Sequence, residues 1–279
     1  MDTVFQALVM GIVQGLTEFL PVSSSGHLIL VPWLFGWTDP FINSLAFSVM
    51  LHVGTLGALL IYFASDWARL VPAGLATIRD RSFQGDPDRK LAWLLVAATI
   101  PAAIAGFFLN DVFEEAVRAP GVVAITLVIG GIVLWLADRL GATTKQVDDV
   151  TFPLAFGIGV AQAIALVPGI SRSGISISAG RFAGLDRASA ARFSFLMATP
   201  VTAGAALLEL RKLIGGEAGV DVSIAPLLVG LVAAFLSGLL AIRVLLDYVR
   251  THSFDIFVIY RFVLAGAVLL LIATGIRPA

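Results

Sequence analysis

The sequence predicts an all-α polytopic membrane protein, because of its composition, its long apolar runs and two interrupted apolar stretches. Of its 279 residues, 58% are hydrophobic and only 13% are charged, whereas a soluble domain carries about 25% charged residues. Lipid is therefore the expected solvent for most of the chain. The formal net charge of -1 argues against a basic nucleic-acid-binding surface. The absence of cysteine excludes disulfides and thiolate metal sites.

Six apolar runs are long enough to cross the hydrocarbon core, which takes about 20 helical residues. They lie near residues 44–64, 91–109, 119–137, 190–210, 224–246 and 256–275. No Lys or Arg precedes Arg69, so the positive start of a signal peptide is missing and the first segment is expected in the mature protein. The basic stretch from Arg69 to Lys90 predicts a cytoplasmic connection, which puts the N-terminus outside.

Two further apolar stretches, residues 4–36 and 152–186, are interrupted by Pro and a Ser/Gly cluster. The interruptions are Pro21-Val-Ser-Ser-Ser-Gly26 and Pro168-Gly-Ile-Ser-Arg-Ser-Gly174. Each half is too short to span a bilayer, and unwound backbone at membrane depth is tolerated only inside protein or beside water. We therefore expect two re-entrant helix hairpins with buried tips.

The two interrupted stretches look like copies of one another. A shift of 148 residues superposes five identical pairs: Gly11 on Gly159, Gln14 on Gln162, Ser23 on Ser171, Ser25 on Ser173 and Gly26 on Gly174. Each copy reads as one hairpin plus three spans, over about residues 1–140 and about residues 150–279 of a single membrane domain. Because three is an odd number, the copies should have inverted topology, with their tips meeting near the midplane.

The first interrupted stretch carries a carboxylate and an amide at helical spacing. Gln14 and Glu18 stand four residues apart and share one helix face. A carboxylate at membrane depth needs a cation, a donor or water. The pair of oxygen ligands suits a divalent cation, Mg²⁺ or Ca²⁺. The alternative is a glutamate satisfied by neighbouring backbone N–H groups.

The first tip also predicts an anion site. Ser23, Ser24 and Ser25, followed by Gly26, can form a turn whose backbone N–H groups face the start of the second half-helix. His27 lies at that start and adds an ionisable group. The alternatives are serines that only cap a helix and a core histidine.

The second tip places an arginine in an apolar setting. Arg172 lies between Ser171 and Ser173 and is followed by Gly174. Its planar guanidinium suits a phosphate, and the alternative is a structural ion pair with Glu18 alone. Together the two tips supply a carboxylate, a histidine, hydroxyls and an arginine at one depth. This set favours phosphoryl transfer, which needs positioning and charge neutralisation around an anionic group.

Other polar residues give weaker predictions. Arg181, Arg187 and Arg192 lie near an expected inner boundary, where long cationic side chains extend toward water. His52 and Arg261 lie within apolar runs and are candidates only for supporting the site.

The sequence resembles the undecaprenyl-diphosphate phosphatase family linked to bacitracin resistance. The family's glutamate-rich motif is similar to Gln14-Gly-Leu-Thr-Glu-Phe-Leu-Pro-Val-Ser-Ser-Ser-Gly-His27, and its second motif is similar to Pro168-Gly-Ile-Ser-Arg-Ser-Gly174. Further similarity covers Gly184-Leu-Asp-Arg-Ala-Ser-Ala-Ala-Arg-Phe-Ser-Phe-Leu196 and Tyr260-Arg261, so the resemblance extends over nearly the whole chain.

The resemblance implies hydrolysis of the C55 lipid undecaprenyl diphosphate to its monophosphate, which recycles the carrier for peptidoglycan synthesis and confers bacitracin resistance. It implies a bacterial inner membrane protein with a site opening to the outer side. By position, Ser24 is the implied nucleophile, His27 its acid/base partner, Arg172 the phosphate clamp and Glu18 a metal or phosphate ligand. The family often has Glu where this chain has Gln14. The implied partners are the lipid substrate and membrane lipids.

Several alternatives stay open. A transporter also uses inverted repeats and broken helices. A membrane acid phosphatase of another type has a Pro-Ser-Gly-His motif, then Ser-Arg and a distant His, but Ser178 occupies the place of that second histidine. The sequence also leaves open whether Ser24 or a water activated by His27 attacks the phosphorus. It does not decide the prenyl length, the metal, a homodimer or flipping of the product.

Overall fold

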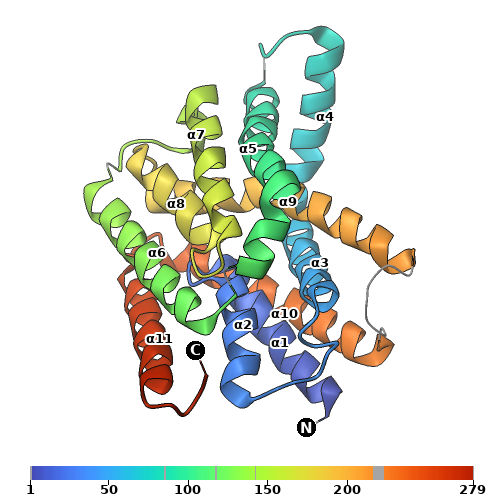
Figure 1. Cartoon of the computed structure of the whole chain (residues 1–279). Coiled ribbons are helices and arrows are strands. Elements are labelled where there is room, and N and C mark those ends of the chain that lie inside the picture. The colour runs from blue at the N-terminus through green and yellow to red at the C-terminus, as the bar shows by residue number, and fades with distance from the viewer. Residues whose placement is uncertain (1, 85, 117, 142, 216–222, 279) are drawn as a thin grey trace.

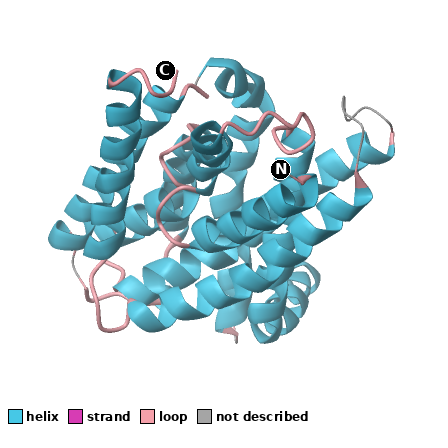
Figure 2. Cartoon of the chain, turned by 90° about the horizontal axis from the view of Figure 1, so that it is seen from below, coloured by secondary structure: helices cyan, strands magenta, loops and turns pink. Residues whose placement is uncertain are grey.

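The chain is folded almost entirely as helices (Figure 1). The computed structural model describes residues 2–84, 86–116, 118–141, 143–215 and 223–278, with the backbone alone for residues 109–116, 209 and 212–214. Within these ranges Figure 2 shows helices joined by loops and no strand, although one isolated bridge joins Lys145 to Leu185. The all-α prediction is confirmed.

The described residues form eleven α-helices and two 3₁₀ helices. In chain order they are α1 (Thr3–Phe19), α2 (Ser24–Phe35), α3 (Leu45–Tyr62), α4 (Ala64–Asp80), α5 (Pro87–Ala116), α6 (Pro120–Leu140), η1 (Val147–Asp149), α7 (Phe152–Ala163), η2 (Ile164–Leu166), α8 (Arg172–Phe182), α9 (Arg187–Ile214), α10 (Ile224–Tyr248) and α11 (Asp255–Ala273).

The six predicted spans are confirmed as helices long and apolar enough to cross a membrane. Among the described residues they are Leu45–Tyr62, Pro87–Phe108, Pro120–Leu140, Arg187–Leu208, Ile224–Tyr248 and Asp255–Ala273. Many of their outward-facing residues are large and apolar, as lipid contact requires. The chain is therefore a multi-pass membrane protein.

The basic stretch between the first two spans is more ordered than the sequence analysis expected. Residues 64–80 form α4, which packs against α5 at the upper end of the molecule in Figure 1. Its buried residues, Asp66, Leu70, Ala73 and Thr77, recur at spacings of four and three and so share one face. The charged residues on the other face lowered the mean hydropathy and hid this amphipathic pattern.

Each interrupted stretch is a pair of short helices joined by an irregular tip. The first pair, α1 and α2, breaks at Pro21, whose ring disfavours a helical residue before it. The second pair, α7 with η2 and then α8, breaks at Pro168 and Gly169, and Gly169 has φ of +95°. Figure 1 places α1 and both chain ends in the lower part of the molecule, and α7 and α8 in the upper part.

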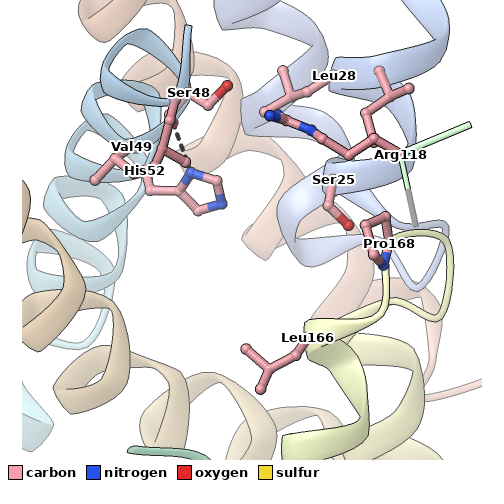
Figure 3. Close-up of a pocket in the computed structure, with 10 residues that line it drawn as sticks. Ser25, Leu28, Ser48, Val49, His52, Arg118, Leu166 and Pro168 are labelled. Carbon is pink, nitrogen blue, oxygen red and sulfur yellow. Dashed lines mark hydrogen bonds between the residues drawn. The ribbon is translucent and has the colours of Figure 1, made fainter. Parts of the chain in front are cut away.

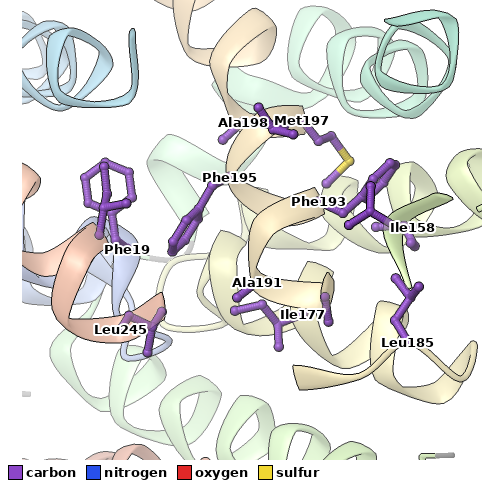
Figure 4. Close-up of a cluster of buried hydrophobic side chains, with 14 of the residues drawn as sticks. Phe19, Ile158, Ile177, Leu185, Ala191, Phe193, Phe195, Met197, Ala198 and Leu245 are labelled. Atoms are coloured by element: carbon purple, nitrogen blue, oxygen red, sulfur yellow. The ribbon is translucent and has the colours of Figure 1, made fainter. Parts of the chain in front are cut away.

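A buried apolar cluster packs around α9 and supports both tips (Figure 4). Phe195 of α9 meets the ring of Phe19 edge-on, with the ring centroids 5.4 Å apart. On another side of α9, Phe193 lies beside Ile158 of α7. Phe19 directly follows Glu18, so burial of its ring in this cluster holds the end of α1 in place.

Glycines let two helix pairs approach closely. A Cβ atom on Gly11 of α1 would lie 2.3 Å from the carbonyl oxygen of Gly230 in α10. A Cβ atom on Gly159 of α7 would lie 2.2 Å from the carbonyl oxygen of Ala98 in α5. Neither pair of helices could keep this separation with a larger residue.

Candidate active site

The two tips have the same local geometry. Ser23 and Ser171 are the N-caps of α2 and α8, and both have a positive φ, 75° and 78°. Each hydroxyl accepts a hydrogen bond from a glycine N–H three residues later, at 3.3 Å from Gly26 and at 3.1 Å from Gly174. Positive φ is costly for a residue with a Cβ atom, so such strain usually marks a functional site.

The remaining tip serines repeat the correspondence. Ser25 lies 3.3 Å from the hydroxyl of Ser23, and Ser173 lies 3.2 Å from the hydroxyl of Ser171. These hydroxyls and glycine N–H groups are therefore engaged within the tips, where they hold the turns in shape.

The tips also touch each other directly. The N–H of Gly169 donates to Ser23 Oγ at 3.1 Å, and Ser173 Oγ donates to the carbonyl oxygen of Leu20 at 3.2 Å. Both bonds join the first interrupted stretch to the second. The residues that the sequence analysis selected from two distant motifs therefore belong to one site.

Glu18 is the centre of this site. Its Oε2 accepts from Ser24 Oγ at 2.5 Å and from Gln14 Nε2 at 3.0 Å. Its Oε1 accepts from Arg172 Nη2 at 2.6 Å. The carboxylate is buried and thus carries the paired cation and donors that a charge at membrane depth needs.

Arg172 is part-buried, and its Nη1 lies 3.5 Å from the carbonyl oxygen of Ser194. The ion pair with Glu18, weighed as a structural alternative, is present. The Arg172 side chain stays 17% exposed. Because it and the Ser24 hydroxyl both contact the Glu18 carboxylate, the guanidinium can also meet an anion bound near Ser24.

His52 joins the cluster; its position inside an apolar run had made it a candidate for supporting the site, but no motif spacing pointed to Glu18 as its partner. Its Nε2 lies 3.4 Å from Glu18 Oε2, and its Nδ1 bonds the carbonyl oxygen of Ser48 at 2.8 Å. An ionisable residue inside an apolar span was the available signal, but no motif linked it to Glu18. The contact depends on the packing of α3 beside α1.

His27 does not contact the Ser24 hydroxyl. Its Nδ1 lies 2.7 Å from the carbonyl oxygen of Ser23, and its Nε2 lies 2.6 Å from the hydroxyl of Tyr260. The rings of His27 and Tyr260 are nearly parallel, at 9° with centroids 5.6 Å apart. His27 therefore connects the first tip to α11.

Arg261, next to Tyr260, supports the second tip. Its side chain is fully buried, and its Nη2 donates to the carbonyl oxygens of Gly169 and Ile170 at 2.9 and 2.5 Å. A Cβ atom on Gly130 of α6 would lie 2.8 Å from Arg261 Nη1. The guanidinium thus occupies space that only a glycine leaves free.

Arg181 corrects an expectation of the sequence analysis. Its side chain does not extend to water but is 1% exposed, with Nε 3.4 Å from Asp138 Oδ1. Arg187 also bonds Asp138, at 2.7 Å, while Arg192 bonds Asp66 and is partly exposed. These arginines join helix ends and lie outside the Glu18 cluster.

A pocket with a volume of about 150 Å³ borders the cluster (Figure 3). Its polar lining consists of Ser25, Ser48, His52 and Arg118, with Pro168 at the second tip. Ser25 and His52 connect the pocket to the Glu18 cluster, because Ser25 is adjacent to Ser24 in the chain and His52 contacts Glu18. The rest of the lining is apolar: Leu28, Ile29, Leu45, Val49 and Leu166.

The residues partly fit a divalent cation. Gln14 Oε1 is buried without a hydrogen-bond partner, beside the Glu18 carboxylate that Gln14 Nε2 contacts. In the part of the chain that the structure describes, no three His, Asp or Glu side chains gather as a metal cage. Mg²⁺ commonly uses one or two protein oxygens together with substrate phosphates, and this donor set suits that mode.

Fold and site together define a polytopic membrane protein with a buried polar site suited to a phosphate group. The family model described as Bacitracin resistance protein BacA matches residues 7–267. The chain belongs to this family, as the sequence motifs predicted.

Curated relatives agree over nearly their whole length. The chain is 48% identical to an undecaprenyl-diphosphatase of Desulforudis audaxviator (strain MP104C) over 269 residues, 96% of this chain and 97% of that protein. It is 48% identical to one of Gemmatimonas aurantiaca over 266 residues, 95% and 96% of the two chains. It is 42% identical to one of Thermodesulfovibrio yellowstonii over 271 residues, 97% and 98% of the two chains.

Proposed function

We propose that this chain is an undecaprenyl-diphosphatase, which hydrolyses undecaprenyl diphosphate to undecaprenyl phosphate and inorganic phosphate. The observation that carries the proposal is the contact of Ser24 and Arg172 with the same buried carboxylate, Glu18. A hydroxyl, a base and a cation held together match the parts needed for phosphoryl transfer. Relatives of nearly the same length carry this activity in their names.

In the proposed first step, Ser24 Oγ attacks the terminal phosphorus. The hydroxyl proton passes to Glu18 Oε2, which already accepts its hydrogen bond at 2.5 Å. The bond from the terminal phosphorus to the bridging oxygen breaks, and undecaprenyl phosphate leaves with that oxygen. Water then cleaves the phosphoserine and releases inorganic phosphate.

The contacts favour Glu18 over His27 as the acceptor of the Ser24 proton. The resemblance implied His27, but both ring nitrogens of His27 lie at hydrogen-bond distance from other groups, Ser23 O and Tyr260 Oη. We infer that His27 positions the tip that carries Ser24. Trapping a phosphoserine at residue 24 supports this route, whereas its absence during rapid turnover favours direct attack by water.

Arg172 neutralises charge on the transferred phosphoryl group in this mechanism. Its guanidinium already contacts Glu18, and the side chain is 17% exposed. A divalent cation held by Glu18 and Gln14 Oε1 would supply further neutralisation of the diphosphate when bound.

We infer that the interrupted stretches are re-entrant and belong to two inverted repeats. The support is the shared geometry of Ser23 and Ser171 and the matched close contacts of Gly11 and Gly159, which are 148 residues apart in the chain. Gly11 meets the middle span of the second copy, and Gly159 meets the middle span of the first copy. This exchange is the packing expected of interlocked repeats.

We further propose a bacterial inner membrane location with the site open to the outer side. The chain lacks cysteine, so single cysteines can report topology without background. A reagent that cannot cross the membrane should label Thr38→Cys in intact cells and should not label Arg81→Cys. Labelling of Arg81→Cys alone would reverse the orientation.

The activity is tested with purified protein in detergent. Phosphate release from undecaprenyl diphosphate should occur with the wild type and be lost with Ser24→Ala. A well-folded wild type that binds the lipid and releases no phosphate would contradict the proposal and favour a transporter.

A further inference from the structure

Arg118 is a cation at the site that the mechanism above does not use. It lies between α5 and α6, two residues before Pro120, which begins α6. The side chain is exposed and lines the pocket that borders Ser25 and His52. Figure 3 shows it extending toward the α3 side of the pocket, which carries Ser48 and His52.

Arg118 forms no ion pair or hydrogen bond with any described side chain. The ion pairs and hydrogen bonds of the described residues engage Arg172, Arg181 and Arg261 elsewhere, but none includes Arg118. Among the residues whose side chains the structure describes, no carboxylate lines the pocket. An arginine in such a setting is available to an anionic ligand.

The pocket lining indicates what kind of anion fits. Five aliphatic residues form its walls: Leu28, Ile29, Leu45, Val49 and Leu166. Among the described residues, the polar groups that line it are two hydroxyls, one imidazole and one guanidinium. Such a lining favours a ligand that has a negative head and an apolar stem. A cavity of about 150 Å³ holds a head group and its first carbons, so a longer chain must leave toward lipid.

The pocket also has a definite position relative to the nucleophile. Ser25 lines the pocket, whereas the hydroxyl of the preceding Ser24 donates to Glu18, the carboxylate that Arg172 also contacts. A lipid diphosphate that enters with its terminal phosphate near Ser24 therefore has its other phosphate on the pocket side.

Resting on the proposed function, we propose that Arg118 binds the phosphate nearest the prenyl chain, which is the phosphate that the lipid product retains. Arg118 is then a substrate-binding and specificity residue, separate from the Ser24, Glu18 and Arg172 cluster. Because the same phosphate is present in substrate and product, Arg118 should contribute to the binding of both. Its loss should weaken binding without removing a group from the reacting phosphorus.

The test is Arg118→Gln in full-length protein, with Arg243→Gln as the matched control. Arg243 is also exposed, lies on α10 and does not line this pocket. We expect Arg118→Gln to raise KM for the prenyl diphosphate at least tenfold with kcat changed less than threefold. Inhibition by undecaprenyl phosphate should weaken by a similar factor. Arg118→Lys should recover part of the loss, because charge remains without the planar fork.

Binding gives a readout that does not need turnover. In Ser24→Ala protein, adding Arg118→Gln should raise the Kd for undecaprenyl diphosphate and for undecaprenyl phosphate at least tenfold. Free inorganic phosphate should bind equally weakly to both proteins, because it lacks the apolar stem.

The outcomes separate this inference from the proposed function. A folded wild type that releases no phosphate removes the proposed function. An active wild type whose KM and product inhibition stay within twofold in Arg118→Gln overturns the inference alone. An equal rise of KM in Arg243→Gln also overturns it, since net surface charge would then be the cause.

Discussion

Arg172 Nη2 lies 2.6 Å from Glu18 Oε1, although 154 residues separate them in the chain. The two side chains come from different interrupted helices, one beginning α8 and the other near the end of α1. The site therefore exists only when both tips are in place. The same contact makes the charge of each residue tolerable at membrane depth, so structure and chemistry depend on one ion pair.

Replacing Arg172 by Lys should keep the protein folded but lower kcat/KM by about 10²-fold or more. Lysine preserves a positive charge near Glu18 and loses the fork that can face both a carboxylate and a phosphate. Steady-state turnover and thermal unfolding in detergent measure the two effects. Arg139→Lys, at an exposed arginine paired with Asp255, is the control. Near-normal turnover would reduce Arg172 to an ion-pair partner.

Double variants test whether the residues act as one unit. Ser24→Ala and His27→Ala should each be nearly inactive. Combining either with Arg172→Lys should cost less than the product of the separate effects, because residues of one catalytic unit are not additive. Strictly multiplicative losses would argue against a composite site.

Replacing Tyr260 by Phe should lower kcat/KM about 10- to 100-fold while the fold is retained. The change removes the hydroxyl that lies 2.6 Å from His27 Nε2 and keeps the nearly parallel ring. If His27 acts by positioning the tip, the loss should be smaller than that of His27→Ala. Equal activity of Tyr260→Phe and wild type would mean that this hydrogen bond has no part in turnover.

Removing divalent cations should abolish turnover and leave the unfolding temperature of the ligand-free protein nearly unchanged. A metal held by Glu18, Gln14 and substrate phosphates would be needed only when the diphosphate is bound. Assays in excess EDTA, followed by readdition of Mg²⁺ or Ca²⁺, measure this dependence. Full activity in EDTA would leave Glu18 as a base paired with Arg172 alone.

The sequence predicted most of this site, because its polar residues stand out in an apolar chain. Glu18 and Ser24 were selected from one motif and Arg172 from another, and the structure brings all three together. The six spans were predicted from length and hydropathy for the same reason. Intramembrane polar residues are costly, so each one is informative even without a known partner.

The contacts that were missed depend on long-range packing. The contact of His52 with Glu18 requires α3 to lie beside α1, and the contact of Tyr260 with His27 spans 233 residues. No periodicity in one segment encodes such distances. The helix α4 was missed for another reason, since its charged face concealed a regular buried face.

Asp39, in the loop between α2 and α3, should make stability depend on acidic pH. Burial raises the pKa of its carboxyl, but hydrogen bonds from Thr3 Oγ1 and from the N–H groups of Ile42 and Phe41 outweigh it, so the folded pKa lies below its ordinary value. A depressed folded pKa gives stability that is present above the unfolded pKa, about 3.9, and is lost as pH falls through the folded pKa.

Replacing Asp39 by Asn should therefore lower the unfolding temperature at neutral pH by a few degrees. The difference between the two proteins should shrink as the pH falls below about 4. Thermal unfolding in detergent at several pH values measures it. A difference that grows on acidification would contradict the assigned sign.

Replacing Gly159 by Ala should destabilise the protein, whereas replacing Gly157 by Ala on the same helix should not. A Cβ atom at Gly159 would lie 2.2 Å from the carbonyl oxygen of Ala98, a backbone atom that cannot rotate away. Forcing α7 off α5 by such overpacking costs about 1–3 kcal/mol. At Gly157 nothing lies within 4 Å of the added atom, so the higher helix propensity of Ala, worth about 1 kcal/mol, should dominate.

The opposite signs make the two variants a matched pair. Thermal unfolding should show a lower transition temperature for Gly159→Ala and an equal or higher one for Gly157→Ala. Gly11→Ala should behave like Gly159→Ala, because its Cβ atom would lie 2.3 Å from the carbonyl oxygen of Gly230. Activity should fall with stability in these two variants, since α1 and α7 lead directly into the tips that carry Ser24 and Arg172. Equal stability of Gly159→Ala and Gly157→Ala would show that α7 and α5 are not packed as closely as the glycine contact requires.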